Sequence, residues 1–296
     1  MTKESLELLM HRDATLTEAR LKEYYEEDED IKVLLDAERY SLFAGGKRVR
    51  PVLVIEFCKL FGGREEAALP FACGLEMLHT ASLIHDDLPC MDNDDLRRGK
   101  PTNHKVFGET MALLAGDSLL IGAFEAVASN RAVTPEIAAN ATAYLASCAG
   151  RYGMVGGQVM DLEGEHKKLT LDQLLKLHSM KTGALINSAC VLGALAAGIS
   201  PDSNAMRDVV TYAEKIGLAF QILDDLLDKI GNAEELGKNV GMDEEREKNT
   251  FLSFFSQEEA AEYAKRLTKE ATEAIGRYPG SETLCDLALW LSKRTK

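Results

Sequence analysis

The chain has 296 residues, with 34 Lys and Arg against 48 Asp and Glu, which gives a formal net charge of −14. Proteins that bind duplex nucleic acid normally carry a basic excess, because much of their affinity comes from neutralising phosphates, so the composition excludes that class. Hydrophobic residues make up 46% of the chain. That share is enough for a folded core and excludes an intrinsically disordered protein.

Proline spacing and residue composition predict an all-α fold. The seven prolines leave the intervals 136–200 and 202–278 uninterrupted, and both intervals are rich in Ala, Leu, Glu and Lys, which favour helices. No run of alternating β-branched residues is bounded by hairpin turns, so no strands are expected. Because the composition does not change along the chain, we expect one domain over residues 1-296.

The sequence shows no feature typical of secretion or membrane insertion. Residues 1–20 mix charges and lack the apolar core of a signal peptide. The six cysteines are scattered without metal-ligand or redox spacing, as in proteins whose thiols stay reduced. The most apolar run, Ala184–Gly198, is too short to span a bilayer. We therefore expect a cytoplasmic protein with no stable membrane insertion.

A first acidic cluster follows an apolar segment expected to be helical, Leu75–Ile84. It reads HDDLPCMDNDD over residues 85–95 and holds five aspartates within ten positions. Two carboxylates about 4 Å apart repel each other by about 4 kcal/mol at an effective dielectric constant of about 20, so the cluster needs solvent or a bridging cation. Pro89 is expected to interrupt the helix and to turn Asp92 back towards Asp86. Taken alone, the cluster could equally be a solvated acidic loop.

A second cluster, in the segment FQILDDLLDKIG, favours the cation. Helical spacing puts Gln221, Asp224 and Asp228 on one face, amid apolar residues that indicate partial burial. Two helices that each offer aspartates to a common space form a site of hard oxygen ligands. Such ligands, without paired His or Cys, favour Mg²⁺ or Mn²⁺ over zinc.

Basic residues stand beside both clusters. They are Lys47, Arg48 and Arg50 in GGKRVRP, then Arg97, Arg98 and Lys100, then Lys181, Lys238 and Lys248. A single Lys or Arg is usually a solvated surface charge. In an acidic chain, this placement instead indicates anion binding, because Arg and Lys are the usual partners of phosphate. A metal and basic side chains around an apolar interior suggest a diphosphate with a hydrocarbon tail.

Other metal and nucleotide sites have little support. Glu76 and His79 form one ExxH pair, but a di-iron bundle needs two such pairs, and a lone histidine of this kind is normally part of the core. The chain contains no GxGxxG, Walker A, GxSxG or HExxH motif. Nucleotide-binding, serine hydrolase and zinc protease functions are therefore not indicated.

Three motifs together resemble one family, the trans-isoprenyl diphosphate synthases, which include farnesyl and geranylgeranyl diphosphate synthases. They are YSLFAGGKRVRP at Tyr40–Pro51, DDLPCMDNDDLRRGKPTNH at Asp86–His104 and DDLLD at Asp224–Asp228. The resemblance covers nearly the whole chain. It implies a helical bundle around a deep central cavity, a homodimer, small-molecule diphosphate substrates and three Mg²⁺ ions per active site, with Mn²⁺ as a possible substitute.

The resemblance also implies a role for each matching residue. The magnesium ligands are Asp86, Asp92 and Asp224. Isopentenyl diphosphate is held by Lys47, Arg50, His79 and Arg98. The allylic diphosphate is held by Arg97, Lys181 and Lys238, with Lys248 nearby. Thr182 and Gln221 face the cationic intermediate.

The implied activity is condensation of isopentenyl diphosphate with an allylic diphosphate, either dimethylallyl, geranyl or farnesyl diphosphate. Magnesium-assisted ionisation gives an allylic cation, which the second substrate attacks to yield farnesyl or geranylgeranyl diphosphate. Two alternatives remain open. A terpene cyclase usually replaces the second aspartate motif, and a non-catalytic partner subunit tends to lose one of the two. This chain keeps both motifs.

Product length depends on the residues that precede the first aspartate motif. Relatives that make farnesyl diphosphate often carry a bulky aromatic residue four or five positions before it, whereas this chain has Ser82 and Ala81. Five residues correspond to about 7.5 Å along a helix, where a growing tail would pass. The tunnel should then continue towards Leu78, Met77 and Gly74, which favours the twenty-carbon product. The two extra residues inside the first motif are typical of short-chain enzymes.

Overall fold

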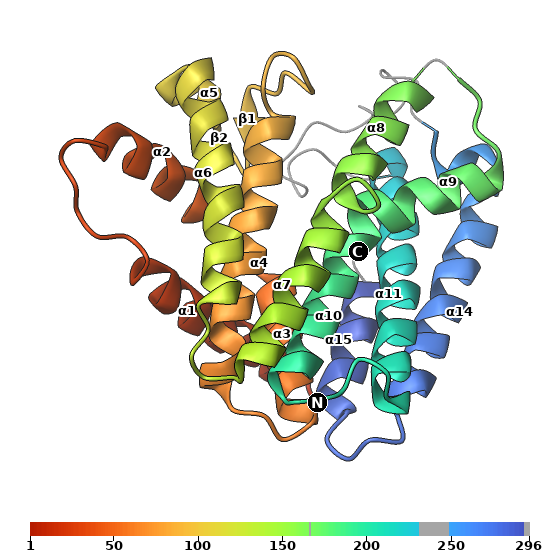
Figure 1. Ribbon diagram of the computed structural model, residues 1–296. Helices are drawn as coiled ribbons and strands as arrows, with labels where there is room; N and C mark the ends of the chain where they lie inside the picture. Colours follow the sequence, from red (N-terminus) through yellow and green to blue (C-terminus); the bar gives the residue numbers. More distant parts are fainter. Residues whose placement is uncertain (166, 231–248, 293–296) are drawn as a thin grey trace.

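The computed structural model describes residues 1–165, 167–230 and 249–292, and helices make up almost all of its regular structure (Figure 1). The first half of the chain forms α1 (Lys3–Lys22), α2 (Lys32–Leu42), α3 (Val49–Leu60), α4 (Glu65–Asp86), α5 (Asn103–Phe107), α6 (Glu109–Ala128) and α7 (Pro135–Ala149). The second half forms α8 (Met154–Gly164), α9 (Leu171–His178), α10 (Ala184–Ala196), α11 (Asn204–Ile230), α14 (Gln257–Ile275) and α15 (Glu282–Ser292). A π-helical turn covers Ser179–Gly183 and a 3₁₀ turn covers Phe251–Ser253. The predicted all-α fold is confirmed.

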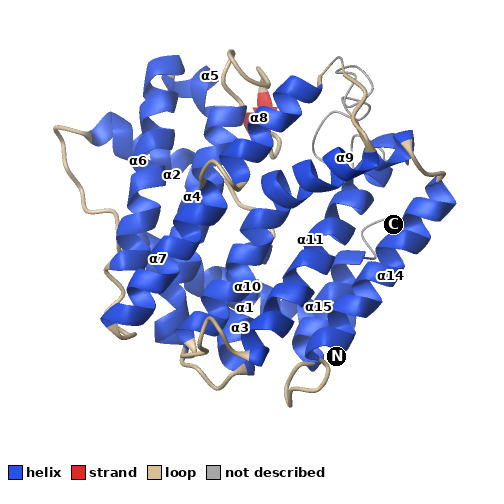
Figure 2. Cartoon of the chain, turned by 45° about the vertical axis from the view of Figure 1, so that its right-hand side comes forward, coloured by secondary structure: helices blue, strands red, loops and turns tan. Residues whose placement is uncertain are grey.

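The expectation of no strands is wrong at one place. Two short antiparallel strands, β1 (Leu96–Arg97) and β2 (Lys100–Pro101), form a hairpin inside the first aspartate motif, drawn in red in Figure 2. The two turn residues, Arg98 and Gly99, both have positive φ, at 54° and 74°. This is the backbone of the turns that favour hairpins, but Arg-Gly is an unusual sequence for them, so the composition gave no signal.

Side-chain caps fix where several helices begin. Thr134 accepts a hydrogen bond from the Ile137 amide at the start of α7, directly before Pro135. At the start of α14, Ser256 and Glu259 bond to each other's backbone amides and form a complete capping box. Such caps satisfy amides that have no partner within the helix, so these starting points are set locally by the sequence.

Two hydrophobic clusters hold the helices together, and α11 belongs to both. The larger cluster contains Val209, Tyr212 and Ile216 from the first half of α11, together with buried residues of α3, α4, α6, α7, α10 and α15. The smaller cluster takes Ile222 and Leu226 from its second half and packs them with α9, α14 and the 3₁₀ turn. The second aspartate motif therefore lies on a helix that is fixed along its whole length.

Glycines let α4 and α6 approach each other closely. A Cβ atom on Gly74 would lie 2.6 Å from the carbonyl oxygen of Ala123, and one on Gly116 would lie 2.1 Å from Nε2 of His85. Both helices are long and apolar enough to cross a membrane by length and composition. In α4, however, 78% of the most apolar stretch is buried inside the protein, whereas in α6 the share is 39%. Thus α4 is a core helix, while α6 buries one side and exposes the other.

Candidate active site

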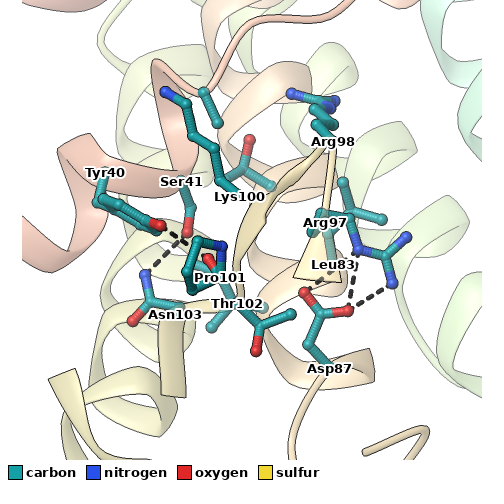
Figure 3. A pocket seen from close by; sticks show the side chains of 13 residues that line it. Tyr40, Ser41, Leu83, Asp87, Arg97, Arg98, Lys100, Pro101, Thr102 and Asn103 are labelled. Carbon is teal, nitrogen blue, oxygen red and sulfur yellow. Dashed lines mark hydrogen bonds and ion pairs between the residues drawn. The ribbon is translucent and has the colours of Figure 1, made fainter. Parts of the chain in front are cut away.

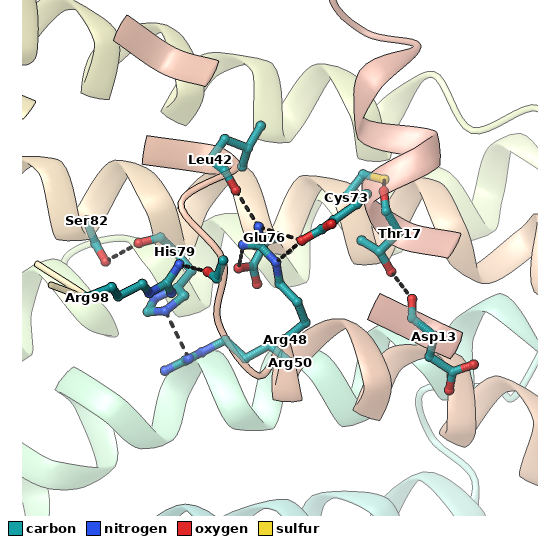
Figure 4. A network of polar contacts seen from close by, with 12 residues as sticks. Asp13, Thr17, Leu42, Arg48, Arg50, Cys73, Glu76, His79, Ser82 and Arg98 are labelled. Atoms are coloured by element: carbon teal, nitrogen blue, oxygen red, sulfur yellow. Dashed lines mark hydrogen bonds and ion pairs between the residues drawn. The ribbon is translucent and has the colours of Figure 1, made fainter. Parts of the chain in front are cut away.

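The three basic residues of GGKRVRP, in the loop before α3 and at its start, do not point the same way. Arg48 has a φ of 47° and points into the protein, where its side chain is fully buried. Its guanidinium donates to Oε1 of Glu76 on α4, to Oε1 of Glu18 on α1 at 3.1 Å and to the carbonyl of Leu42 at the end of α2 (Figure 4). The prediction that Arg48 contributes to anion binding is therefore wrong, because carboxylates inside the protein already neutralise it.

The neighbouring basic residues meet the histidine of α4. Nη1 of Arg50 lies 3.2 Å from Nε2 of His79, and Arg98 stands beside the same ring in Figure 4. Burial lowers the pKa of His79 well below its usual value, and the charges of Arg50 and Arg98 lower it further. His79 is therefore a neutral hydrogen-bonding group between two cations. The di-iron role considered for the Glu76–His79 pair has no support here, because Glu76 is paired with Arg48.

Arg98 reaches this group because Gly46 leaves room for it. A Cβ atom on Gly46 would lie 2.9 Å from Cζ of Arg98, and the guanidinium donates to the carbonyl of Gly45. Lys47, in the same loop, has its ammonium 5.0 Å from the ring centroid of Trp290 on α15. Of the four residues expected to hold isopentenyl diphosphate, the structure thus brings Arg50, His79 and Arg98 together and turns the Lys47 side chain towards the last helix.

The first aspartate motif folds back on the end of α4. The amide of Asp92 donates to the carbonyl of Asp86 at 2.8 Å, so the prediction that the chain turns Asp92 back towards Asp86 is confirmed. Burial raises the pKa of Asp86 to about 6, the charge of Lys181 opposes this rise and the charge of Asp92 adds to it. These opposing effects indicate that three of the predicted site residues act on one another electrostatically.

Asp87, the second residue of the motif, has an internal role instead. It is buried and accepts hydrogen bonds from Nε of Arg97 at 2.9 and 3.2 Å. Asp94 accepts a further bond from Arg97 at 3.3 Å. Because Arg97 is held by two carboxylates, it stabilises the loop. Its predicted contact with the allylic diphosphate stays a prediction.

Polar contacts also fix the hairpin against α2. The hydroxyl of Tyr40 donates to the carbonyl of Pro101 at 2.7 Å, and Nδ2 of Asn103 donates to Oγ of Ser41 at 2.8 Å (Figure 3). They surround a pocket of about 30 Å³ whose wall also includes Asp87 and Arg97. This volume suits water rather than a diphosphate. The pocket is therefore part of the support for the motif.

Lys181 and Thr182 lie in the π-helical turn between α9 and α10. The ammonium of Lys181 forms an ion pair with Asp161 on α8. A Cβ atom on Gly157 would lie 2.3 Å from the Lys181 amide nitrogen, so this turn packs directly against α8. Single π-turns inside helices occur frequently at functional sites. Asp161 was missed by the sequence reasoning. The only signal was an acid near the end of the apolar segment GGQVMDL.

In the second motif, Gln221 forms a hydrogen bond with Asp225. Nε2 of Gln221 donates to Oδ1 of Asp225 at 3.1 Å, and the amide of Phe251 donates to Oδ2 of the same residue at 2.8 Å. Asp225 is buried and holds the 3₁₀ turn against α11. Asp224, the predicted ligand, is more exposed than Asp225. Lys238 and Lys248 lie outside the described residues.

The aspartates fit magnesium by the chemistry of their donor atoms. Asp86 ends α4 and Asp224 lies near the end of α11, at the same end of the bundle (Figure 1). Within residues 1–165, 167–230 and 249–292, no three His, Cys, Asp or Glu side chains converge as in a complete metal site. Magnesium is usually held by one or two carboxylates, with water and substrate phosphate completing its shell, so it does not need such a group.

Comparisons with known proteins identify the family of this chain. Residues 31–279 match the family model of the polyprenyl synthetases. A geranylgeranyl diphosphate synthase of Cyanophora paradoxa is 50% identical over 82% of this chain and 81% of its own length. A heterodimeric geranylgeranyl pyrophosphate synthase large subunit of Arabidopsis thaliana is 48% identical over 86% of this chain and 70% of its own length. A geranyltransferase of Helicobacter pylori, solved with magnesium and isoprenyl diphosphate, has a TM-score of 0.87 at 33% identity, with 99% of each chain covered.

The chain belongs to the polyprenyl synthetase family. The resemblance inferred from its motifs is confirmed, and so is prenyltransferase activity of the short-chain prenyl diphosphate synthase type.

The buried ion pair between Arg48 and Glu76 gives a prediction about stability. Glu76→Gln leaves the buried charge of Arg48 without its deepest partner, so the free energy of unfolding should fall by about 3 kcal/mol. Glu18→Gln is the matched control, because Glu18 bonds the same guanidinium but its side chain is 37% exposed. Its loss should stay below about 1 kcal/mol. Urea unfolding of both variants measures the difference, and equal losses would contradict the assignment of Glu76 as the main partner.

Proposed function

We propose that this protein condenses isopentenyl diphosphate with an allylic diphosphate and releases the twenty-carbon geranylgeranyl diphosphate. The observation that carries the product length is the absence of a bulky side chain at the positions four and five residues before Asp86 on α4. Ala81 and Ser82 are both small, and Oγ of Ser82 is bonded to the His79 carbonyl at 2.8 Å. The Cyanophora relative, named for the same product, supports this choice.

Each of the two substrates binds to its own set of basic residues. Arg50, His79, Arg98 and Lys47 bind the diphosphate of isopentenyl diphosphate, and the neutral His79 lets two arginines lie close to the same anion. Lys181 stands by Asp86 and binds the allylic diphosphate together with Arg97, Lys238 and Lys248. This division keeps the two diphosphates on separate sets of cations, so that the reacting carbon atoms approach each other.

The cationic side chains also favour the chemical step. The allylic carbon–oxygen bond breaks with both electrons going to the departing diphosphate, whose growing charge is stabilised by preorganised cations. The double bond of isopentenyl diphosphate then attacks the allylic cation, and the proton lost from the adduct goes to the released diphosphate. Thr182 and Gln221 direct oxygen dipoles at the cation, while the apolar bundle keeps water away from it.

Magnesium completes the site. The family depends on it, and the Helicobacter structure contains it. We propose three ions per active site, with Asp86 and Asp92 as ligands on one wall and Asp224 on the other, and with Mn²⁺ as a substitute. When bound, the metal supplies positive charge that neutralises the diphosphate of the leaving group. In this chain, the proposal is supported by the fact that all three predicted ligands are carboxylates, which magnesium prefers.

An elongation assay tests the activity. The protein is incubated with isopentenyl diphosphate, farnesyl diphosphate and Mg²⁺, and chromatography should show a twenty-carbon product that a chelator abolishes. Asp86→Asn should lower kcat by about 100-fold, because even indirect partners of metal ligands are worth about 10- to 100-fold. The control is Asp95→Asn in the same motif, whose carboxylate is 74% exposed and pairs with Lys105. A wild-type protein that forms no product longer than its primer rules the proposal out.

A single substitution tests the product length. Ala81→Tyr places an aromatic ring one and a half turns below Asp86, where the tail of the growing product passes. The main product should change from twenty to fifteen carbons, with the rate of the first condensation within about threefold of wild type. Chromatography of the products from dimethylallyl diphosphate measures the change. Unchanged product length would show that the floor of the tunnel lies elsewhere.

We propose that the exposed side of α6 binds a second copy of the chain. Its apolar residues Leu113, Leu114 and Ile121 are 46%, 48% and 68% exposed and lie close together on one helical face. Contiguous exposed apolar patches usually mark protein interfaces or membrane contacts. One relative is named as the large subunit of a heterodimeric synthase, which supports a protein interface rather than a membrane contact.

Sedimentation analysis tests this interface. Wild-type protein should sediment at twice the chain mass, and Ile121→Asp should shift it to the monomer because the charge would be buried at the contact. Leu8→Asp on α1, where Leu8 is 70% exposed, is the matched control and should remain dimeric. A monomeric wild type, or one that binds lipid vesicles through α6, contradicts the proposal.

A further inference from the structure

Lys47, in the loop expected to bind isopentenyl diphosphate, contacts Trp290 on α15. The ammonium of Lys47 lies 5.0 Å from the centroid of the Trp290 ring. Cations within about 6 Å of an aromatic ring centre are attracted to the face of the ring, and tryptophan gives the strongest such contact. Lys47 is exposed in the loop before α3, whereas Trp290 is half-buried on α15.

The ring of Trp290 packs against the core. On α15, Leu287 and Leu291 are both almost completely buried, and the tryptophan itself packs against the larger hydrophobic cluster. The helix in turn packs against α1, α3, α11 and α14. A tryptophan side chain has only two rotatable bonds, so its ring forms a fixed surface at little cost in entropy.

The main chain of Lys47 is fixed from the other side. Arg48, the next residue, is tied to α1, α2 and α4 by its buried hydrogen bonds. Ordering the four-carbon stem of a lysine costs rotamer entropy, which reduces the affinity for a ligand bound at its ammonium. The ring of Trp290 contacts the ammonium end of Lys47 and lowers this cost.

We propose that Trp290 is a positioning residue that orients the Lys47 ammonium for the diphosphate of isopentenyl diphosphate. This inference rests on the proposed role of Lys47 in binding that substrate. A ring face is suited to the task because it orients a cation without neutralising it. The carboxylates that hold Lys181 and Arg97 do neutralise their partners in part. Lys47 can therefore keep its contact with the ring and still offer its charge to a phosphate.

Steady-state kinetics test this role. Trp290→Leu should raise the KM for isopentenyl diphosphate about two- to fivefold, which corresponds to the usual strength of an exposed cation–π contact. The KM for the allylic substrate and kcat should change by less than about twofold. Trp290→Phe keeps a ring and should restore part of the loss. Leu289→Ala, at a 43% exposed position of the same helix, is the control for a general effect on α15 and should behave as wild type.

A double-mutant cycle separates positioning from a structural role. In a Lys47→Gln background, Trp290→Leu should leave the KM for isopentenyl diphosphate unchanged, because the ring no longer has an ammonium to orient. If Trp290→Leu raises this KM equally with and without Lys47, or does not raise it in either background, the inference is wrong. Wild-type protein that does not elongate any primer would instead overturn the proposed function.

The sequence provides an independent readout, because Trp290 is the only tryptophan of the chain. Its emission should change when isopentenyl diphosphate is added to wild-type protein, since a phosphate bound to the ammonium alters the electric field at the ring. In Lys47→Gln the same addition should leave the emission unchanged. A signal of equal size in both proteins would show that the ring senses the substrate without Lys47, which contradicts the inference.

Discussion

The buried guanidinium of Arg48 joins four helices at one point. Arg48 directly precedes α3, and its guanidinium bonds to α1 through Glu18, to the end of α2 through the Leu42 carbonyl and to α4 through Glu76. Its left-handed backbone costs about 1–2 kcal/mol, which persists because the surrounding contacts determine the conformation. This conformation sends Arg48 inward, and it leaves Arg50 beside His79 and Lys47 beside Trp290. The placement of the other basic residues thus depends on this ion pair.

In each aspartate motif, the two adjacent aspartates have different roles. In the first motif Asp87 holds Arg97, and in the second Asp225 holds the amide of Phe251. Adjacent helical residues point about 100° apart, so one acid of each pair turns into the protein while its neighbour faces elsewhere. The neighbours are Asp86 and Asp224, the predicted magnesium ligands. One aspartate of each doublet therefore supports the loop or turn next to the site.

Much of this arrangement could be predicted from the sequence. Proline spacing and helix-forming residues were sufficient for the all-α fold, and the charge clusters with their spacing were sufficient for the family. The inward turn of Arg48 was not predictable, because a run of basic residues does not reveal which backbone conformation each adopts. The hairpin at Arg98 was missed for a similar reason, since its left-handed backbone is carried by an arginine. Asp161 was missed because its partner Lys181 is distant in the sequence and reaches it only through packing.

The π-helical turn at Ser179–Gly183 joins two helices that pack in different hydrophobic clusters. On one side of the turn, Leu174 of α9 packs in the smaller cluster, and on the other side the side chains of α10 pack in the larger one. A wider turn rotates the helix after it relative to the helix before it, because it contains more residues than an α-helical turn. The turn therefore sets which face of α10 points into the larger cluster, given the orientation of α9 in the smaller one. Lengthening or shortening it by one residue would misalign a whole helix with its core.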